Sequence, residues 1–227
     1  MSNEHLNIAI DGPAGAGKST AAKLLAKLMG LHYLDTGAMY RAIALYCIRK
    51  GVDPLDEKRV GEVLDDADIH VVYRDDGAQR VLLGDEDVTD LLRTQEIGMG
   101  ASNVSKHRVV RDKLTQLQRA VAKEYDVVMD GRDITTNVLK DSKHKFYITA
   151  SVQERARRRR GELMENGGTD KTMDQICEEI AARDKNDMER DYMPLRIADD
   201  AIIIDTTDMD IDEVVEALKK AILEEEE

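Results

Sequence analysis

The sequence comprises 227 residues, of which 42% are hydrophobic and 35% are charged, a balance typical of a globular protein with a sizeable core. Its formal net charge of -13 argues against nucleic acid or an anionic membrane as a partner, because both attract an excess of Lys and Arg. Cys47 and Cys177 are far apart in the sequence and form no metal-ligand spacing, so neither a disulfide scaffold nor a zinc site is indicated. We expect a cytoplasmic protein that captures any anion at a local basic site.

Short apolar runs alternate with helical patterns along most of the chain. Buried strands are expected at 6–10, 31–34, 126–129, 145–149 and 201–204, and one long helical pattern runs from about 95 to 123. Strands that alternate with helices predict an α/β fold, with a parallel sheet, right-handed crossovers and helices on both faces. In such sheets ligands bind at the carboxyl ends of the strands, where the polar clusters of this sequence lie.

The segment 69–88 has a different pattern. Ile69, Val71 and Tyr73 alternate with polar residues, a turn sequence follows at 75–77, and a second apolar run ends at Gly84. This pattern is typical of a β-hairpin. We expect a small antiparallel insertion that is separate from the main sheet.

Residues 12–19 match the phosphate-binding motif G-x-x-x-x-G-K-[ST], between a predicted strand and a predicted helix. Such glycines let backbone N–H groups and the helix N-terminus surround a polyphosphate, while Lys18 reaches the β- and γ-phosphates and Ser19 binds Mg²⁺. A glycine turn that merely caps a helix is the simpler alternative. A dinucleotide site is disfavoured because the Lys-Ser pair has no role there. The predicted ATP-binding residues are Gly12, Pro13, Ala14, Gly15, Ala16, Gly17, Lys18, Ser19 and Thr20.

An arginine-rich run at 154–160 stands out in an acidic protein. On a helix, Arg155, Arg158 and Arg159 share one face. A solvated basic face is the ordinary interpretation of such a run. Beside a phosphate-binding loop, the arginines are instead suited to neutralise a transferring phosphoryl group from a closing lid.

Two further clusters follow predicted elements. Residues 130–133 end a buried strand, so Asp130 is expected near the metal, through water, while Arg132 and Asp133 face an acceptor; a tight turn with a surface ion pair is the alternative. Arg183 and Arg190 are two helical turns apart and share a face, as bidentate phosphate ligands would. Without other context, a solvated helix is the safer interpretation.

Together these clusters resemble the bacterial cytidylate kinase family of nucleoside monophosphate kinases. The resemblance covers nearly the whole chain, and its segments occur in the family's order: 10–19, 34–41, 93–96, 130–134, 154–156, 183–184, 194–195 and 205–207. It implies ATP and CMP or dCMP as substrates, Mg²⁺ as cofactor and a monomer. It also implies a P-loop NTPase-type sheet of five parallel strands, a lid, and a nucleoside monophosphate-binding region enlarged by the β insertion.

The resemblance also implies how the chain is divided and which residues bind CMP. The expected core is 1–36, 97–150 and 195–227, the acceptor-binding region is 37–96 with an insertion at about 67–90, and the lid with its following helices is 151–194. Arg158 resembles the lid residue that covers the adenine. The catalytic set is Lys18, Arg155, Arg158, Arg159, Asp133 and Arg190. The CMP-binding set is Thr36, Tyr40, Arg41, Arg93, Ser102, Arg111, Arg132, Asp133, Arg183 and Arg190.

One segment departs from the family pattern. After Ile134 the family commonly has Gly-Thr-Val-Val, whereas this chain has Thr135, Thr136, Asn137 and Val138. Thr in place of Gly removes conformational freedom at positive φ and adds bulk beside the acceptor site. We therefore expect sugar preference and catalytic rate to be affected first.

Other functions are also compatible with a phosphate-binding loop. A kinase for another small acceptor, such as UMP, dTMP or shikimate, is the nearest alternative, and a nucleotide-binding switch without transferase activity is an alternative of a different class. A guanine-specific switch should carry Asn-Lys-x-Asp, which does not occur in this sequence. A switch would also have little use for two further arginine clusters.

Overall fold

The computed structural model describes residues 5–165 and 167–224. Among these residues, 5–6 and 30–127 form one compact unit, and 7–29, 128–165 and 167–224 form a second. Within the described residues, no helix combines the length and apolar character that crossing a membrane requires. The division into core, acceptor-binding region and lid stays a prediction.

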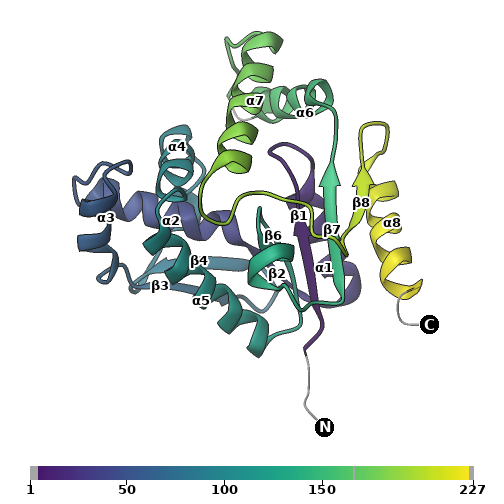
Figure 1. The fold of residues 1–227 in the computed structure, drawn as a ribbon, viewed down its shortest axis with the longest axis horizontal. Coiled ribbons are helices and arrows are strands. Elements are labelled where there is room, and N and C mark those ends of the chain that lie inside the picture. Colours follow the sequence, from purple (N-terminus) through teal and green to yellow (C-terminus); the bar gives the residue numbers. More distant parts are fainter. Residues whose placement is uncertain (1–4, 166, 225–227) are drawn as a thin grey trace. The chain divides into compact units, whose positions relative to one another are not determined.

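The main sheet has five parallel strands in the order β2-β6-β1-β7-β8 (Figure 1). These strands lie within two residues of the positions that the apolar runs predict, which confirms the α/β fold. Ile8, Ala9 and Ile10 of β1 are fully buried, as expected for a strand covered on both faces. The strands are β1 (Asn7–Asp11), β2 (His32–Asp35), β6 (Val127–Asp130), β7 (His144–Thr149) and β8 (Ile202–Asp205).

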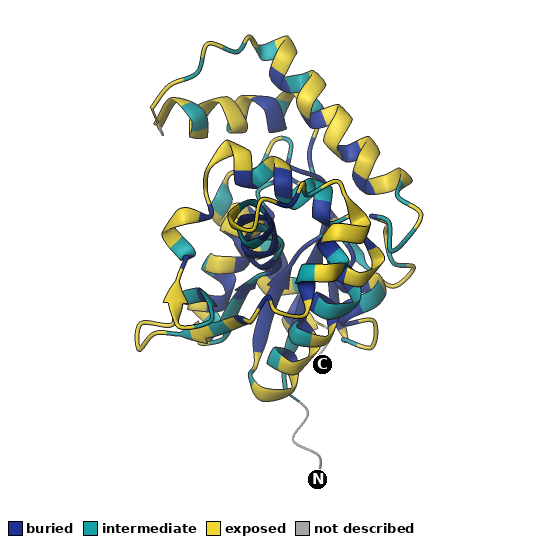
Figure 2. Ribbon diagram, turned by 90° about the vertical axis from the view of Figure 1, so that its left-hand side faces the viewer, coloured by how far each residue is buried: buried dark blue, intermediate teal, exposed yellow. Residues whose placement is uncertain are grey.

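The second unit contains four α-helices and a short π-helix. Helices α6 and α7 pack together through Ala156, Ile176 and Ile180, and Figure 2 shows both as largely exposed ribbons. Thr172 and Gln175 form a capping box at the start of α7, which satisfies N–H groups that the helix itself leaves unpaired. The elements are α1 (Lys18–Met29), η2 (Ile134–Val138), α6 (Val152–Glu165), α7 (Met173–Glu189) and α8 (Ile211–Glu224).

The first unit contains the predicted antiparallel insertion. Strands β3 and β4 pair from Ile69 with Leu83 to Tyr73 with Gln79, and Gly77 in the turn has a φ of 77°. The separate small sheet is therefore confirmed. Helix α3 was not predicted, because its mostly charged sequence buries only Val60 and Leu64. The elements are α2 (Thr36–Arg49), α3 (Glu57–Leu64), β3 (Ile69–Tyr73), β4 (Gln79–Leu83), β5 (Glu86–Asp87), η1 (Thr89–Leu91), α4 (Gln95–Val104) and α5 (Arg108–Glu124).

The single helical pattern predicted at about 95–123 is wrong in one respect, because the structure has two helices there. Helix α4 ends at Val104 and α5 begins at Arg108. The Ser105 hydroxyl donates to the Ser102 carbonyl, and the N–H groups of Lys106 and His107 bond three residues back. These local bonds compete with the α-helical pattern and end the first helix.

The π-helix η2 depends on a buried carboxylate at the end of β1. Asp11 accepts hydrogen bonds from the backbone N–H groups of Ile134 and Thr135 and from the Thr135 hydroxyl, at 2.6 to 2.9 Å. Burial raises the pKa of Asp11 to about 6, while the three donors oppose that shift. At pH 7 the ionised carboxylate therefore satisfies three buried donors.

We expect Asp11→Asn to destabilise the fold by about 1–3 kcal/mol, because one carboxylate oxygen becomes an NH₂ group that faces a buried donor. Urea unfolding at pH 7.5 would measure the change. Asp208→Asn, at an exposed position, is the control and should leave the unfolding free energy nearly unchanged. Equal stability of wild type and Asp11→Asn would show that Asp11 does not hold η2.

Candidate active site

Residues 12–19 form the loop between β1 and α1. Gly12, Gly15 and Gly17 have φ angles of 148°, 75° and 87°, a region that side chains with a Cβ rarely adopt. A Cβ on Gly12 would lie 1.9 Å from the Ile148 carbonyl oxygen in β7. The glycines are therefore required by backbone conformation and by close packing, which is the geometry that a phosphate-binding loop needs.

Lys18 is almost fully buried at the start of α1, with 4% of its surface exposed. Its ammonium group donates to the Pro13 carbonyl at 2.7 Å, across the loop. Burial, and then the charge of Arg132, lower the pKa of Lys18 to about 7, although Asp130 acts in the opposite direction. A polyphosphate bound in the loop would favour the charged ammonium form.

Ser19 and Asp130 form a pair of oxygen donors beside this lysine. The Ser19 hydroxyl donates to an Asp130 carboxylate oxygen at 2.8 Å. Among the described residues, no group of three or more His, Cys, Asp or Glu side chains could hold a metal ion. Mg²⁺ typically binds one or two protein oxygens together with phosphate oxygens and water, so this small oxygen donor set fits Mg²⁺.

A buried ion pair joins α6 and α7 to the loop. Arg155 donates to Asp184 at 2.5 Å and to the Ala14 carbonyl at 3.0 Å. The other oxygen of Asp184 accepts the Ala14 N–H at 3.2 Å. Arg155 and Asp184 are 5% and 8% exposed, so each charge depends on the other. Arg155 thus lies at the loop, as the sequence predicts.

The other two arginines of the predicted α6 face differ in their positions. Arg158 donates to the Thr206 carbonyl at 2.6 Å and to the Ala16 carbonyl at 3.3 Å. Arg159 is exposed and pairs with Glu162 within α6. The structure therefore brings Arg155 and Arg158 to the loop, but not Arg159.

Three of the predicted acceptor-site residues, Arg132, Asp133 and Arg190, belong to a buried charged cluster in the second unit. Arg132 donates to Asp187 at 2.8 Å, and Arg190 lies 3.9 Å from Asp187 and 3.7 Å from Asp133. Burial raises the pKa of Asp187, but the charge and hydrogen bond of Arg132 outweigh it, and the net pKa is below its ordinary value. Arg183 is exposed on α7 and contributes to the lowered pKa of Lys18.

The remaining residues predicted for the acceptor site lie in the first unit. The Arg111 side chain is fully buried, 5.5 Å from the centre of the Tyr40 ring, and donates to the Ser105 carbonyl at 3.3 Å. Arg41 forms an ion pair with Asp35 at 2.7 Å. Three more predicted residues take separate positions: Thr36 is buried at the start of α2, Ser102 is half-buried in α4, and Arg93 is exposed after η1.

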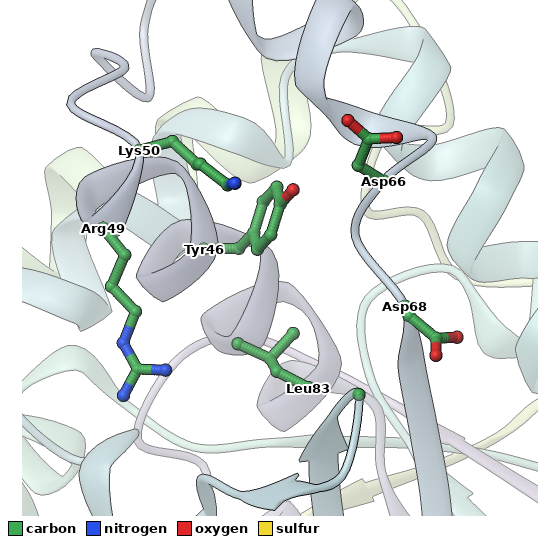
Figure 3. A pocket seen from close by; sticks show the side chains of 7 residues that line it. Tyr46, Arg49, Lys50, Asp66, Asp68 and Leu83 are labelled. Carbon is green, nitrogen blue, oxygen red and sulfur yellow. The ribbon is translucent and has the colours of Figure 1, made fainter.

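A cavity of about 420 Å³ lies elsewhere in the first unit (Figure 3). Lys50 extends over the Tyr46 ring, 5.4 Å from its centre. The cavity includes none of the predicted site residues. It is lined by Tyr46, Arg49, Lys50, Asp66, Asp68, Leu83 and Gly84.

Sequence reasoning missed three buried carboxylates in or beside the candidate site: Asp11, Asp184 and Asp187. Asp184 and Asp187 lie between Arg183 and Arg190, the two residues that the sequence interpretation selected. The available signal was electrostatic, because buried arginines require nearby negative charges. Which carboxylate pairs with which arginine depends on the tertiary fold.

The parallel sheet and the glycine loop that joins β1 to α1 define a P-loop nucleotide-binding protein. The family model described as "Cytidylate kinase" matches residues 8–224. The chain belongs to the cytidylate kinase family, which confirms the resemblance seen in the sequence.

Curated relatives match over most of their length. The chain is 49% identical over 211 residues to the cytidylate kinase of Caldicellulosiruptor bescii, covering 93% of this chain and 92% of that protein. It is 50% identical over 222 residues to the cytidylate kinase of Caldanaerobacter subterraneus subsp. tengcongensis, covering 98% and 96%.

A solved structure of an uncharacterized protein from Eubacterium ventriosum is also similar to this chain. It has a TM-score of 0.50 and 16% identity, with 97% of this chain and 99% of that chain covered. At this identity the similarity supports the fold alone.

We expect Gly12→Ala to destabilise the protein by at least about 2 kcal/mol, because the added Cβ collides with the backbone of β7 and is strained at positive φ. Thermal and urea unfolding would measure it. Gly61→Ala is the matched control: Gly61 lies inside α3, and a Cβ added there would have no heavy atom within 4 Å. That substitution should stabilise by roughly 0.5–1 kcal/mol. Similar effects of the two substitutions would contradict the close packing at Gly12.

Proposed function

We propose that the protein transfers the γ-phosphoryl group of ATP directly to CMP or dCMP, giving ADP and CDP or dCDP. The observation that carries this proposal is the buried loop with Lys18, in a chain that matches cytidylate kinases along nearly its whole length. No side-chain nucleophile is needed, because phosphoryl transfer depends on alignment and charge stabilisation.

The donor site consists of the loop and the residues that support it. Backbone N–H groups of residues 12–19 and the N-terminus of α1 would bind the ATP phosphates. Lys18 would neutralise the β- and γ-phosphates, and Ser19 would hold Mg²⁺, with Asp130 acting through water. When bound, Mg²⁺ supplies positive charge that stabilises the negative charge of the phosphates.

The acceptor site would use cationic and hydrogen-bonding side chains. Arg111, Arg132 and Arg190 are suited to the CMP phosphate, because guanidinium groups bind phosphate oxygens in pairs. Ser102, Asp133 and Arg183 are suited to the base and sugar. A carboxylate accepts a hydrogen bond from the 4-amino group of cytosine, which makes Asp133 the candidate for base recognition. The remaining proposed contacts are Thr36, Tyr40, Arg41 and Arg93.

The lid would be formed by α6 and α7. Arg155 and Arg158 would stabilise negative charge on the transferring group, Arg159 would join them on closure, and Arg158 would also cover the adenine. Closure would exclude water, which otherwise competes for the phosphoryl group. We propose that the enzyme acts as a monomer in the cytoplasm, without nucleic acid or membrane as a partner.

The alternative acceptors UMP, dTMP and shikimate, and the alternative of a switch without transferase activity, are not favoured by membership of the cytidylate kinase family. A coupled ADP-release assay with ATP, Mg²⁺ and each of CMP, dCMP, UMP, dTMP, AMP and shikimate would test the proposal. A specificity constant (kcat/KM) that is highest for CMP or dCMP supports it. A preference for any other acceptor overturns it.

We expect Lys18→Ala to reduce kcat by at least about 10³-fold with the fold retained, because the main cation at the transferring phosphate is lost. Steady-state turnover and circular dichroism would measure the two effects. The control is Lys23→Ala, at an exposed position on α1, which should keep wild-type turnover. A near-normal rate in Lys18→Ala would show that this loop is not the catalytic site.

Asp133→Ala should raise KM for CMP by roughly tenfold or more while KM for ATP changes less than about twofold, because the lost carboxylate would contact the acceptor and not ATP. Initial rates with each substrate varied in turn would separate the two constants. Asp141→Ala, at an exposed position, should change neither. Equal increases in both constants would mean that Asp133 is not an acceptor-site residue.

A further inference from the structure

Two unusual backbone conformations meet near Asp133. One is the π-helix η2, which follows it directly. The other is Met193, the only non-glycine residue with positive φ among those the structure describes, at 51°. Both features cost conformational energy and occur preferentially at functional sites. Asp133, which lies near both features, is therefore a candidate for a functional role.

Asn137 connects these two features. Its side-chain amide lies 3.1 Å from a carboxylate oxygen of Asp133, to which it donates, and 3.0 Å from the sulfur of Met193. Its backbone N–H also bonds to the Asp133 carbonyl at 3.0 Å. Asn137 thus links the π-helix to the segment that follows α7.

Arg190, at the end of α7, also lies close to Met193 and Asp133. Its Nε donates to the Met193 carbonyl at 2.5 Å, and its terminal nitrogen lies 3.7 Å from the other carboxylate oxygen of Asp133. The Arg190 and Asp133 side chains are 6% and 7% exposed. One Asp133 oxygen therefore faces Asn137 and the other faces Arg190, and together the two contacts restrict rotation of the carboxylate.

We propose that Asn137 is a positioning residue that orients the Asp133 carboxylate to accept a hydrogen bond from the 4-amino group of a pyrimidine, and so favours cytosine over uracil. This inference rests on the proposed function and extends it to a residue outside the predicted site. Cytosine presents a donor at position 4, whereas uracil presents an acceptor oxygen, as thymine does. A fixed carboxylate therefore attracts the 4-amino group of cytosine and repels the 4-oxygen of uracil.

The contact depends on the side-chain amide of Asn137. A valine at this position would have no polar hydrogen and could not donate to Asp133. A neutral donor to a charged acceptor contributes more than a bond between two neutral groups. A carboxylate free to rotate could also turn away from the uracil oxygen, so losing this restraint should reduce discrimination more than turnover.

The test is Asn137→Val, with the adjacent exposed Thr136→Val as the matched control. Specificity constants (kcat/KM) for CMP and UMP, KM for ATP and the melting temperature would be measured for each protein. We expect the CMP to UMP ratio to fall about tenfold in Asn137→Val, with KM for ATP and the melting temperature close to wild type. Thr136→Val should retain the wild-type ratio. An unchanged ratio in Asn137→Val overturns the inference.

If Asn137→Val does not fold, Asn137→Leu provides the same test, because leucine is close to asparagine in size and shape and has no polar hydrogen to donate. The Asp133→Ala background distinguishes an effect of Asn137 through Asp133 from an independent effect of Asn137 on selectivity. If Asn137 acts through Asp133, then adding Asn137→Val to Asp133→Ala should cause no further loss of selectivity. A further tenfold loss in that background overturns the inference. Failure of the wild-type protein to phosphorylate CMP would instead refute the proposed function itself.

Discussion

Burial of positive charge beside the glycine loop is the constraint on which the site depends. Lys18 and Arg155 are both nearly buried, and a buried cation without a partner is strongly unfavourable. Asp184 provides the partner of Arg155 and also accepts the Ala14 N–H. The ion pair therefore fixes the loop to the two helices that would close over ATP, so the residues that stabilise the loop also connect it to the proposed lid.

Much of the fold and the phosphate-binding loop could be predicted because their signals are continuous in the sequence. A buried parallel strand is an uninterrupted apolar run, such as 6–10, and the loop motif occupies eight consecutive residues. The hairpin is likewise local, since alternating residues and one turn determine its pairing. Recognition of the family followed from several such local segments in the correct order.

The features that were not predicted depend on residues that are distant in the sequence or on competition between local hydrogen bonds. The π-helix requires Asp11, more than 120 residues earlier in the chain. The partners of Arg132 and Arg155 lie in α7, and helical periodicity alone cannot identify them. The break between α4 and α5 coincides with local hydrogen bonds of the Ser105 hydroxyl and of the Lys106 and His107 N–H groups, and whether such bonds form depends on the conformation that the segment adopts.

Helices α6 and α7 contact each other through a hydrophobic cluster that is smaller than the core of the sheet. This cluster has three buried residues, Ala156, Ile176 and Ile180, with four partly buried residues packed against them, whereas the strands of the sheet have longer buried runs. Regions with few buried apolar contacts open locally at a free energy well below that of global unfolding. The Arg155–Asp184 pair also joins α6 to α7 and both helices to Ala14, so a local separation of the two helices must break this buried pair as well.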